Sequence, residues 1–161
     1  MNQDLFFDFT VDKPNKLVLI TREFDASLEL VWNAFTQKEY LDQWGAPDPF
    51  IARTRYMDFR EGGKRFYAMV GPDGNERWAL QTYLSITPLS HFKMFNVFAD
   101  KDENPDAHGS EWDFYFSEEN GITTVRIHIY NESFERMESL MEGFKAGYTM
   151  TLEKLQNLLK K

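Results

Sequence analysis

The segment 134–159 reads FERMESLMEGFKAGYTMTLEKLQNLL. Its large apolar residues recur every three or four positions, which predicts one stripe along an α-helix. The stripe consists of Met137, Met141, Phe144, Tyr148, Leu152, Leu155 and Leu159. Ser133 can cap the first turn, where Glu135 suits the helix dipole. At 1.5 Å per residue this helix is roughly 39 Å long, about the width of seven or eight strands. We therefore predict that it lies across a whole sheet.

Two glycines, Gly143 and Gly147, flank this stripe one turn apart. Each costs about 1 kcal/mol relative to alanine inside a helix. Either another backbone approaches closely here, or the small residues leave room for a bound molecule beside Met141, Phe144 and Tyr148. Methionine is flexible and suits a pocket that adapts to its contents, although it also occurs in ordinary cores. The sequence alone leaves both interpretations open.

The composition excludes several classes of protein. The chain has 161 residues, which suits one domain over 1–161 with a core of its own. It has no cysteine, which excludes disulfides and thiolate nucleophiles. The formal net charge of −8 disfavours nucleic acid as a partner. Residues 1–10 do not resemble a signal peptide, and no apolar run approaches the ~20 residues of a membrane span. We expect a cytoplasmic protein without a membrane span and without a cofactor.

Seven stretches of β-forming residues, separated by turn residues, follow an irregular segment 1–15. They cover 16–24, 50–59, 64–70, 76–86, 91–98, 112–117 and 123–130. Two short helices, beginning near Leu28 and Glu39, follow the first strand. The alternation of Leu5, Phe7 and Phe9 either adds a short strand or covers an edge. Hairpin-linked strands after a β-α-α start predict an α+β fold, with an antiparallel sheet of about six or seven strands wrapped around the C-terminal helix.

Period-two alternation suggests which strand residues face that helix. Trp112, Phe114 and Phe116 share one face of the strand 112–117. The matching inward residues on three other strands are expected to be Tyr67, Met69, Trp78, Leu80 and Met94. The opposite face of 64–70 is equally apolar, so the choice of face on the strands 64–70 and 76–86 stays open. Fifteen Phe, seven Tyr and four Trp make irregular space around the sheet plausible, which is compatible with a cavity.

Arg65 stands apart from this apolar set. If Tyr67 and Met69 face a cavity, alternation places Arg65 inward too, near the end of the sheet. A buried guanidinium requires an acceptor. We therefore expect Arg65 either to pair with an acid or to meet a ligand carboxylate or phenolate at the cavity mouth.

The remaining polar residues form no recognised catalytic pattern. Asp102, Glu103, Asp106 and His108 offer oxygen and imidazole ligands, but their spacing matches neither an EF-hand nor HExxH. A solvated acidic loop explains them better. His128 alternates with apolar neighbours and is expected on the solvent face. We predict neither a catalytic residue nor a metal site.

Several strings resemble the Activator of Hsp90 ATPase homologue 1-like branch of the START/Bet v 1-like (SRPBCC) superfamily. They are REFDA at 22–26, VWNAF at 31–35, LDQW at 41–44, GG at 62–63, GPDG at 71–74 and GFKAGY at 143–148. The resemblance extends from about residue 16 to residue 159. It implies a helix-grip fold, in which a strongly curved sheet wraps around the C-terminal helix and a hydrophobic cavity lies between them. It also implies a ligand, because members often bind lipids, polyketides or other apolar small molecules.

These observations favour a binding protein for a hydrophobic or aromatic small molecule that is lipid- or polyketide-like. The expected ligand contacts are Arg65, Tyr67, Met69, Trp78, Leu80, Met94, Trp112, Phe114, Phe116, Met141, Phe144 and Tyr148. One alternative is a protein-interaction module related to Hsp90 ATPase activators, which touches a chaperone through the exposed sheet face or the acidic loop. A second alternative is a cyclase- or hydrolase-like enzyme with polar side chains deep in the cavity.

Overall fold

The computed structural model describes residues 5–160, except for the side chains of Phe134, Met137 and Leu140. The elements are β1 (Phe7–Asp12), β2 (Leu17–Phe24), α1 (Leu28–Thr36), α2 (Lys38–Trp44), β3 (Ile51–Met57), β4 (Lys64–Val70), β5 (Glu76–Thr87), β6 (His91–Ala99), β7 (Ser110–Glu119), β8 (Ile122–Asn131) and α3 (Phe134–Leu159). The long helix expected over 134–159 is confirmed as α3. Met137, a member of its predicted stripe, lies outside the described side chains.

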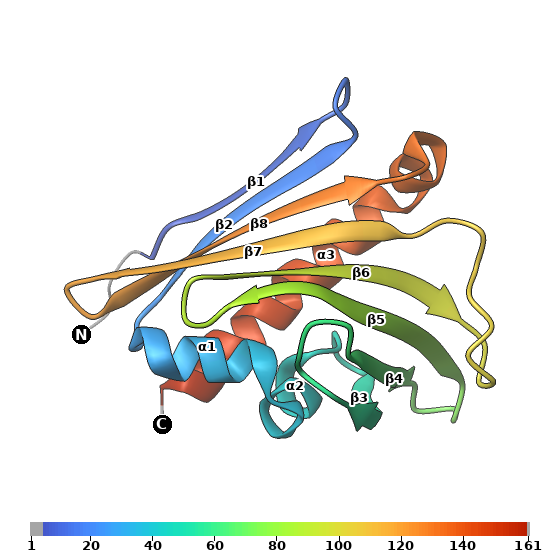
Figure 1. The fold of residues 1–161 in the computed structure, drawn as a ribbon, viewed down its shortest axis with the longest axis horizontal. Helices are drawn as coiled ribbons and strands as arrows, with labels where there is room; N and C mark the ends of the chain where they lie inside the picture. The colour runs from blue at the N-terminus through green and yellow to red at the C-terminus, as the bar shows by residue number, and fades with distance from the viewer. Residues whose placement is uncertain (1–4, 161) are drawn as a thin grey trace.

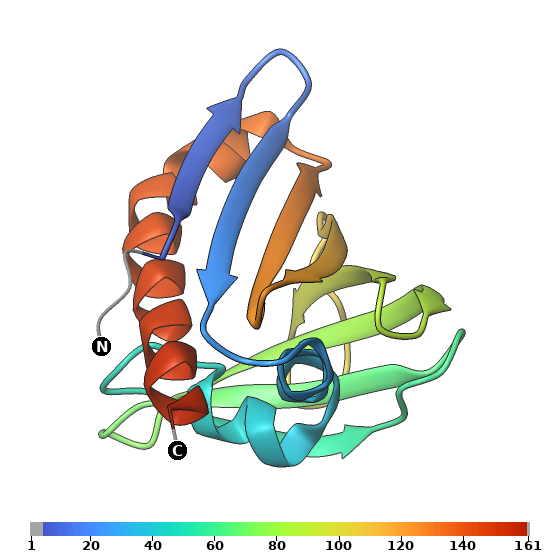
Figure 2. The ribbon, with the colours of Figure 1, turned by 90° about the vertical axis from the view of Figure 1, so that its left-hand side faces the viewer.

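The described strands form one antiparallel sheet in the order β1-β2-β8-β7-β6-β5-β4-β3. Figures 1 and 2 show that the sheet curls, with α3 along its concave side and with α1 and α2 near the C-terminal end of α3. The predicted α+β helix-grip fold is thus confirmed. Because each hairpin joins neighbours in the sheet from β3 to β8, only the β2–β8 pairing spans most of the chain.

The N-terminal segment corrects one expectation. Residues 1–15 were expected to be irregular, with the alternation of Leu5, Phe7 and Phe9 either adding a short strand or covering an edge. Phe7–Asp12 forms the strand β1, which pairs with β2 and raises the strand number to eight. Phe7 and Phe9 are half-buried, and the ring centroid of Phe9 lies 6.1 Å from that of Phe144 on α3. The alternation of aromatic residues therefore belongs to an edge strand that also contacts the long helix.

The apolar stripe of α3 changes character along its length. Leu152 and Leu155 are fully buried, and Leu159 is nearly so. Met141 and Phe144, closer to the N-terminus of the helix, are only partly buried. The C-terminal half of α3 therefore packs into a filled core, whereas the preceding part leaves its apolar side chains incompletely covered.

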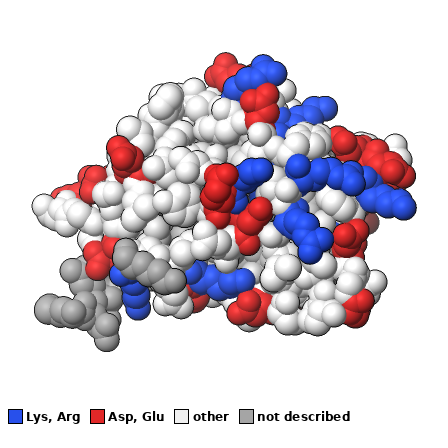
Figure 3. Space-filling view, turned by 90° about the horizontal axis from the view of Figure 1, so that it is seen from below, with Lys and Arg blue, Asp and Glu red and all other residues white. Residues whose placement is uncertain are grey.

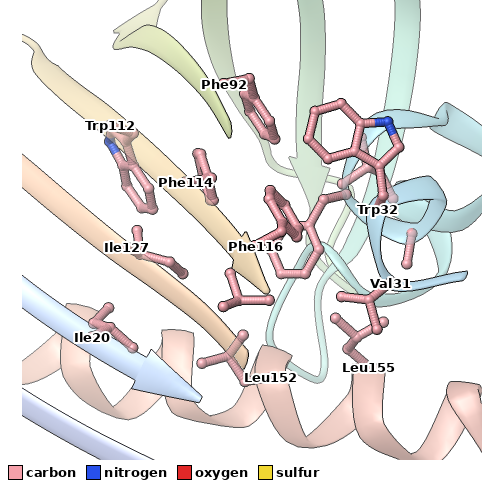
Figure 4. Close-up of a cluster of buried hydrophobic side chains, with 14 of the residues drawn as sticks. Ile20, Val31, Trp32, Phe92, Trp112, Phe114, Phe116, Ile127, Leu152 and Leu155 are labelled. Atoms are coloured by element: carbon pink, nitrogen blue, oxygen red, sulfur yellow. The ribbon is translucent and has the colours of Figure 1, made fainter. Parts of the chain in front are cut away.

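An aromatic cluster fills the core beside the C-terminal half of α3 (Figure 4). Phe92 on β6 stacks on Phe114 of β7 with 4.4 Å between ring centroids. Trp32 from α1 meets Phe116 edge-to-face at 4.9 Å. Leu152 and Leu155 cover this cluster from the helix side (Figure 4). Trp32 and Phe116 lie inside this packed cluster, whereas Phe92 and Phe114 also line the cavity described below and so form its boundary with the core.

The two short helices hold one wall of the core in place. Ser27 caps α1 by accepting a hydrogen bond from the backbone N–H of Leu30, as its residue type favours. Trp44, at the end of α2, donates its indole N–H to the carbonyl of Ala34 at 2.9 Å. The two helices are thus locked together through a buried hydrogen bond.

Figure 3 shows the molecule of Figure 1 from below, and charged residues of both signs are intermixed over this face. The net charge of −8 therefore does not collect in a single acidic area on that face. Among the described residues, no helix has the length and apolar character that crossing a membrane requires.

Candidate ligand-binding cavity

A cavity of about 510 Å³ lies between α3 and the concave face of the sheet. Its walls come from β2, from β4 to β8, from all three helices, and from the segment between α2 and β3 that includes Pro47 and Phe50. Pockets for small molecules in proteins occupy about 300–1,000 Å³. The cavity is therefore large enough for a guest with a polycyclic or long-chain body.

One wall of the cavity is an apolar row that crosses the sheet. The residues of this row lie directly opposite one another on neighbouring strands: Tyr83, Met94, Trp112, Ile129 and Val18. All five line the cavity. Across from them, Trp112 meets Phe144 and Tyr148 of α3 edge-to-face, with centroid distances of 5.9 and 5.5 Å. Aromatic faces and edges thus line the cavity from both sides.

A second, polar row runs beside the first. On each of the strands β5 to β8, its member lies two residues away from the member of the apolar row. Its members are Arg65 on β4, Gln81 on β5, Asn96 on β6, Ser110 on β7 and Asn131 on β8, each directly opposite the next. All five line the cavity. The concave face therefore presents a continuous polar strip next to a continuous apolar one.

Arg65 is the charged end of this row and is 3% exposed. Its Nε donates to Thr54 Oγ1 at 3.1 Å, and Nη1 donates to Gln81 Oε1 at 3.4 Å. The guanidinium also lies over the ring of Tyr67 at 3.8 Å. Asp42 is 3.8 Å from Nη2, which is an ion pair without a hydrogen bond. The acid partner expected for Arg65 is present, but it leaves Nη2 without an acceptor among the described residues.

The glycines of α3 border the cavity. A Cβ atom added to Gly143 would meet no atom of the described residues within 4 Å, so no described backbone segment approaches it. At Gly147 the nearest atom is Pro47 Cγ at 3.5 Å, an ordinary contact with a side chain. Both glycines line the cavity. Of the two interpretations of this pair, close approach of a backbone is therefore wrong for the described surroundings.

Two tyrosines keep their phenols neutral in this setting. Burial raises the pKa of Tyr148, and the nearby Tyr67 adds to the rise. Burial also raises the pKa of Tyr83, while the positive charge of Arg65 opposes the shift. Near neutral pH these hydroxyls are therefore hydrogen-bonding groups on the cavity wall and are not proton acceptors for acid–base chemistry.

Most of the residues proposed from the sequence come together at the cavity. Its lining contains Arg65, Tyr67, Met69, Met94, Trp112, Phe114, Met141, Phe144 and Tyr148. Phe116 points inward as expected, but it belongs to the filled aromatic core instead of the cavity wall.

Trp78 and Leu80 were expected to face inward, and this expectation is wrong. In the β4–β5 hairpin, Tyr67 lies opposite Ala79 and Met69 lies opposite Arg77, so the odd-numbered residues of both strands share the cavity face. Trp78 instead stacks on Phe66 at 4.6 Å on the other face. Because side chains alternate with a period of two, an error of one residue reverses the face of a whole strand.

The acidic residues of the loop after β6 form hydrogen bonds and an ion pair with neighbouring residues. Asp100 accepts hydrogen bonds from the side chain and backbone of Asn104, which lowers its pKa. Glu103 accepts from Tyr56, and Asp106 pairs with Arg136 at 3.2 Å. Within residues 5–160, no group of three or more His, Asp or Glu side chains is arranged to hold a metal ion.

Comparison with known proteins agrees with this architecture. A sequence model of the family described as Activator of Hsp90 ATPase homolog 1-like protein matches residues 25–160. The chain is similar to the crystal structure of protein Ms6760 from Mycobacterium smegmatis, at 25% identity and a TM-score of 0.87, over 97% of this chain and 98% of that one. It is also similar to a protein from Arthrobacter aurescens, at 25% identity and a TM-score of 0.90, over 95% and 91% of the two chains.

The AHSA1 protein SPO3351 from Silicibacter pomeroyi shares the fold at 20% identity and a TM-score of 0.73, over 89% of this chain and 97% of that one. No sequence among the curated proteins matches the chain significantly. The solved relatives thus establish the architecture, and the family model matches most of the length of the chain.

Proposed function

The chain belongs to the Activator of Hsp90 ATPase homolog 1-like family, and from this premise we propose that it is a binding protein for a hydrophobic or aromatic small molecule. The observation that carries the proposal is the cavity of about 510 Å³ between α3 and the sheet. Its apolar row and the aromatic side chains of α3 match the surface that an apolar guest requires. The alternative that the family description supplies is regulation of a chaperone ATPase.

The division of α3 into two halves supports this proposal. A helix that only sealed a core would gain most from burying its whole apolar stripe. Here Leu152 and Leu155 are fully buried, whereas Met141 and Phe144 line the cavity and remain partly exposed. Covering these side chains with a guest would complete the burial, and this gain is the driving force for binding.

The test uses N-phenyl-1-naphthylamine, a neutral apolar dye whose fluorescence rises in apolar surroundings. Titration into the wild-type chain should give saturable enhancement with one binding site. Gly143→Phe places a ring at the cavity border, where a Cβ meets no atom within 4 Å, so the change does not force the backbone to move. The dye affinity should fall at least several-fold.

Ala146→Phe is the matched control. Ala146 lies on the same helix and is exposed, but it does not line the cavity. The control variant should bind the dye like the wild type. Absence of saturable enhancement in the wild-type chain, or equal loss of affinity in both variants, would argue against a ligand-binding cavity and would favour the chaperone alternative.

A further inference from the structure

The charges that line the cavity are of one sign. Three arginines, Arg65, Arg77 and Arg136, contribute to the wall, whereas no aspartate or glutamate is among the described lining residues. The whole chain has 26 acidic and 18 basic residues. Arg136 is paired with Asp106 at 3.2 Å, so the positive potential of the wall comes mainly from Arg77 and from the incompletely paired Arg65. Such a potential attracts an anion.

The most buried of these cations is incompletely paired. Nη2 of Arg65 has no hydrogen-bond acceptor among the described residues, and its nearest carboxylate oxygen, Asp42 Oδ1, is 3.8 Å away. That same oxygen accepts from the backbone N–H of Thr54 at 3.0 Å and from its hydroxyl at 2.6 Å. Oδ1 of Asp42 therefore makes its hydrogen bonds to Thr54 and not to Arg65. Buried donors in native proteins are almost always paired, so Nη2 calls for an acceptor from elsewhere.

Arg65 also orients the amides of the polar row. A guanidinium can only donate, so Gln81 must turn its Oε1 toward Arg65. Its Nε2 then faces Asn96 and donates to Oδ1 at 3.2 Å. Among the described residues, Nδ2 of Asn96 has no hydrogen-bond acceptor at the cavity wall. At the far end of the row, Nδ2 of Asn131 is buried and likewise lacks an acceptor among these residues. The row thus has unpaired side-chain N–H groups on β4, β6 and β8.

We propose that the cavity selects an amphipathic carboxylic acid. The carboxylate accepts a hydrogen bond from Nη2 of Arg65, and further acceptor atoms of the ligand meet the amides of Asn96 and Asn131. The apolar body lies against Trp112 and Phe144 in the neighbouring row. This inference rests on the proposed function, because it requires that the cavity takes an apolar guest, and it adds the charge and the orientation of that guest.

The chemical test compares three ligands that share one apolar chain and differ only in the head group. Decanoate, 1-decanol and decylammonium are titrated at neutral pH, below their micellar concentrations, against bound N-phenyl-1-naphthylamine. A charge-assisted hydrogen bond should make the dissociation constant of decanoate about 10- to 100-fold lower than that of 1-decanol. Decylammonium should bind most weakly. Equal constants for decanoate and 1-decanol would overturn the inference.

Variants then test the role of Arg65. Arg65→Met removes the donors but keeps an unbranched apolar stem, and the preference for decanoate over 1-decanol should fall to about parity. Asp42→Asn removes the competing negative charge and retains an acceptor for Thr54, so this preference should increase. Arg126→Gln is the control, because Arg126 is exposed on β8 and does not line the cavity. It should leave the preference unchanged.

The outcomes separate the two proposals. Far-UV circular dichroism and thermal unfolding first establish that each variant is folded. If Arg65→Met does not fold, the ligand series in the wild type and in Asp42→Asn still decides whether the cavity prefers a carboxylate. If the dye itself does not bind the wild-type chain, the proposed function has failed. If the dye binds but decanoate has no advantage, or keeps its full advantage in folded Arg65→Met, only the selection of an acid is refuted.

Discussion

Arg65 on β4 and Gln81 on β5 lie directly opposite each other, and Nη1 of Arg65 donates to Oε1 of Gln81 at 3.4 Å. Both residues line the cavity, so the pair marks the face of the β4–β5 hairpin that borders it. It also begins the polar row, because Nε2 of Gln81 in turn donates a hydrogen bond to Oδ1 of Asn96. This cross-strand contact therefore connects the register of the hairpin with the donor character of the site.

Gly143→Ala should stabilise the protein. Alanine is favoured over glycine in a helix by about 1 kcal/mol, and the added Cβ meets no atom within 4 Å. Urea denaturation should show an increase of about 0.5–1 kcal/mol in the free energy of unfolding. Ala146→Gly, at an exposed position of the same helix, should lower it by a similar amount. A destabilised Gly143→Ala variant would mean that something crowds this position.

The two halves of α3 should respond differently to truncation. Leu152 is fully buried, so Leu152→Ala should lower the free energy of unfolding by about 2–5 kcal/mol. Met141 borders the cavity and has fewer packing partners to lose, so Met141→Ala should cost no more than about 1.5 kcal/mol. Equal costs in chemical denaturation would show that the N-terminal half of the helix is packed as tightly as the C-terminal half.

The buried tyrosines should make stability fall at alkaline pH. The pKa values of Tyr148 and Tyr83 are raised in the folded state, chiefly by burial. Their contribution to stability is therefore fully present below the unfolded-state pKa of about 10 and is lost as the pH rises through the folded-state values. Urea unfolding between about pH 9 and pH 11 should show this loss, and Tyr148→Phe should reduce it. A Tyr148→Phe variant with the same pH dependence as the wild type would contradict the assignment.

The corrected face of β5 can be tested by comparing two tryptophans. Trp112 lines the cavity between the sheet and α3, whereas Trp78 stacks on Phe66 on the opposite face. Trp112→Phe should weaken binding of N-phenyl-1-naphthylamine several-fold, because it removes contact area and the edge-to-face partner of Tyr148. Trp78→Phe should leave the affinity unaltered. The reverse ranking would place the ligand on the other face of the sheet.

Local patterns were sufficient to predict most of the fold. The stripe of α3 has a helical period over seven turns, and Asn120-Gly121 adopts the positive φ angles that a tight hairpin requires. β1 was predicted only as one of two alternatives, because a short edge strand has little local signal. Its order depends on pairing with β2 and on the contact between Phe9 and Phe144, and both are distant in sequence.

The site was only partly predictable for a related reason. Large apolar residues such as Trp112 and Tyr148 can be recognised in the sequence from their alternation or helical spacing. Gln81, Asn96 and Ser110 carry no individual signal in the sequence, and only the register of three strands brings them into one row. The face of β5 could have been predicted from the length of the β4–β5 turn. A five-residue connection between Val70 and Glu76 places odd-numbered residues of β4 opposite odd-numbered residues of β5, so both sets share one face.

The most direct measurement follows the methionine methyl groups by NMR while N-phenyl-1-naphthylamine is added to methyl-labelled protein. Met69, Met94 and Met141 line the cavity, whereas Met57 and Met150 do not. A guest between α3 and the sheet should shift the first three resonances saturably and together, and should leave the exposed Met150 unmoved. Saturable shifts confined to Met150, or no shifts at Met94 and Met141, would contradict the existence of a ligand-binding cavity.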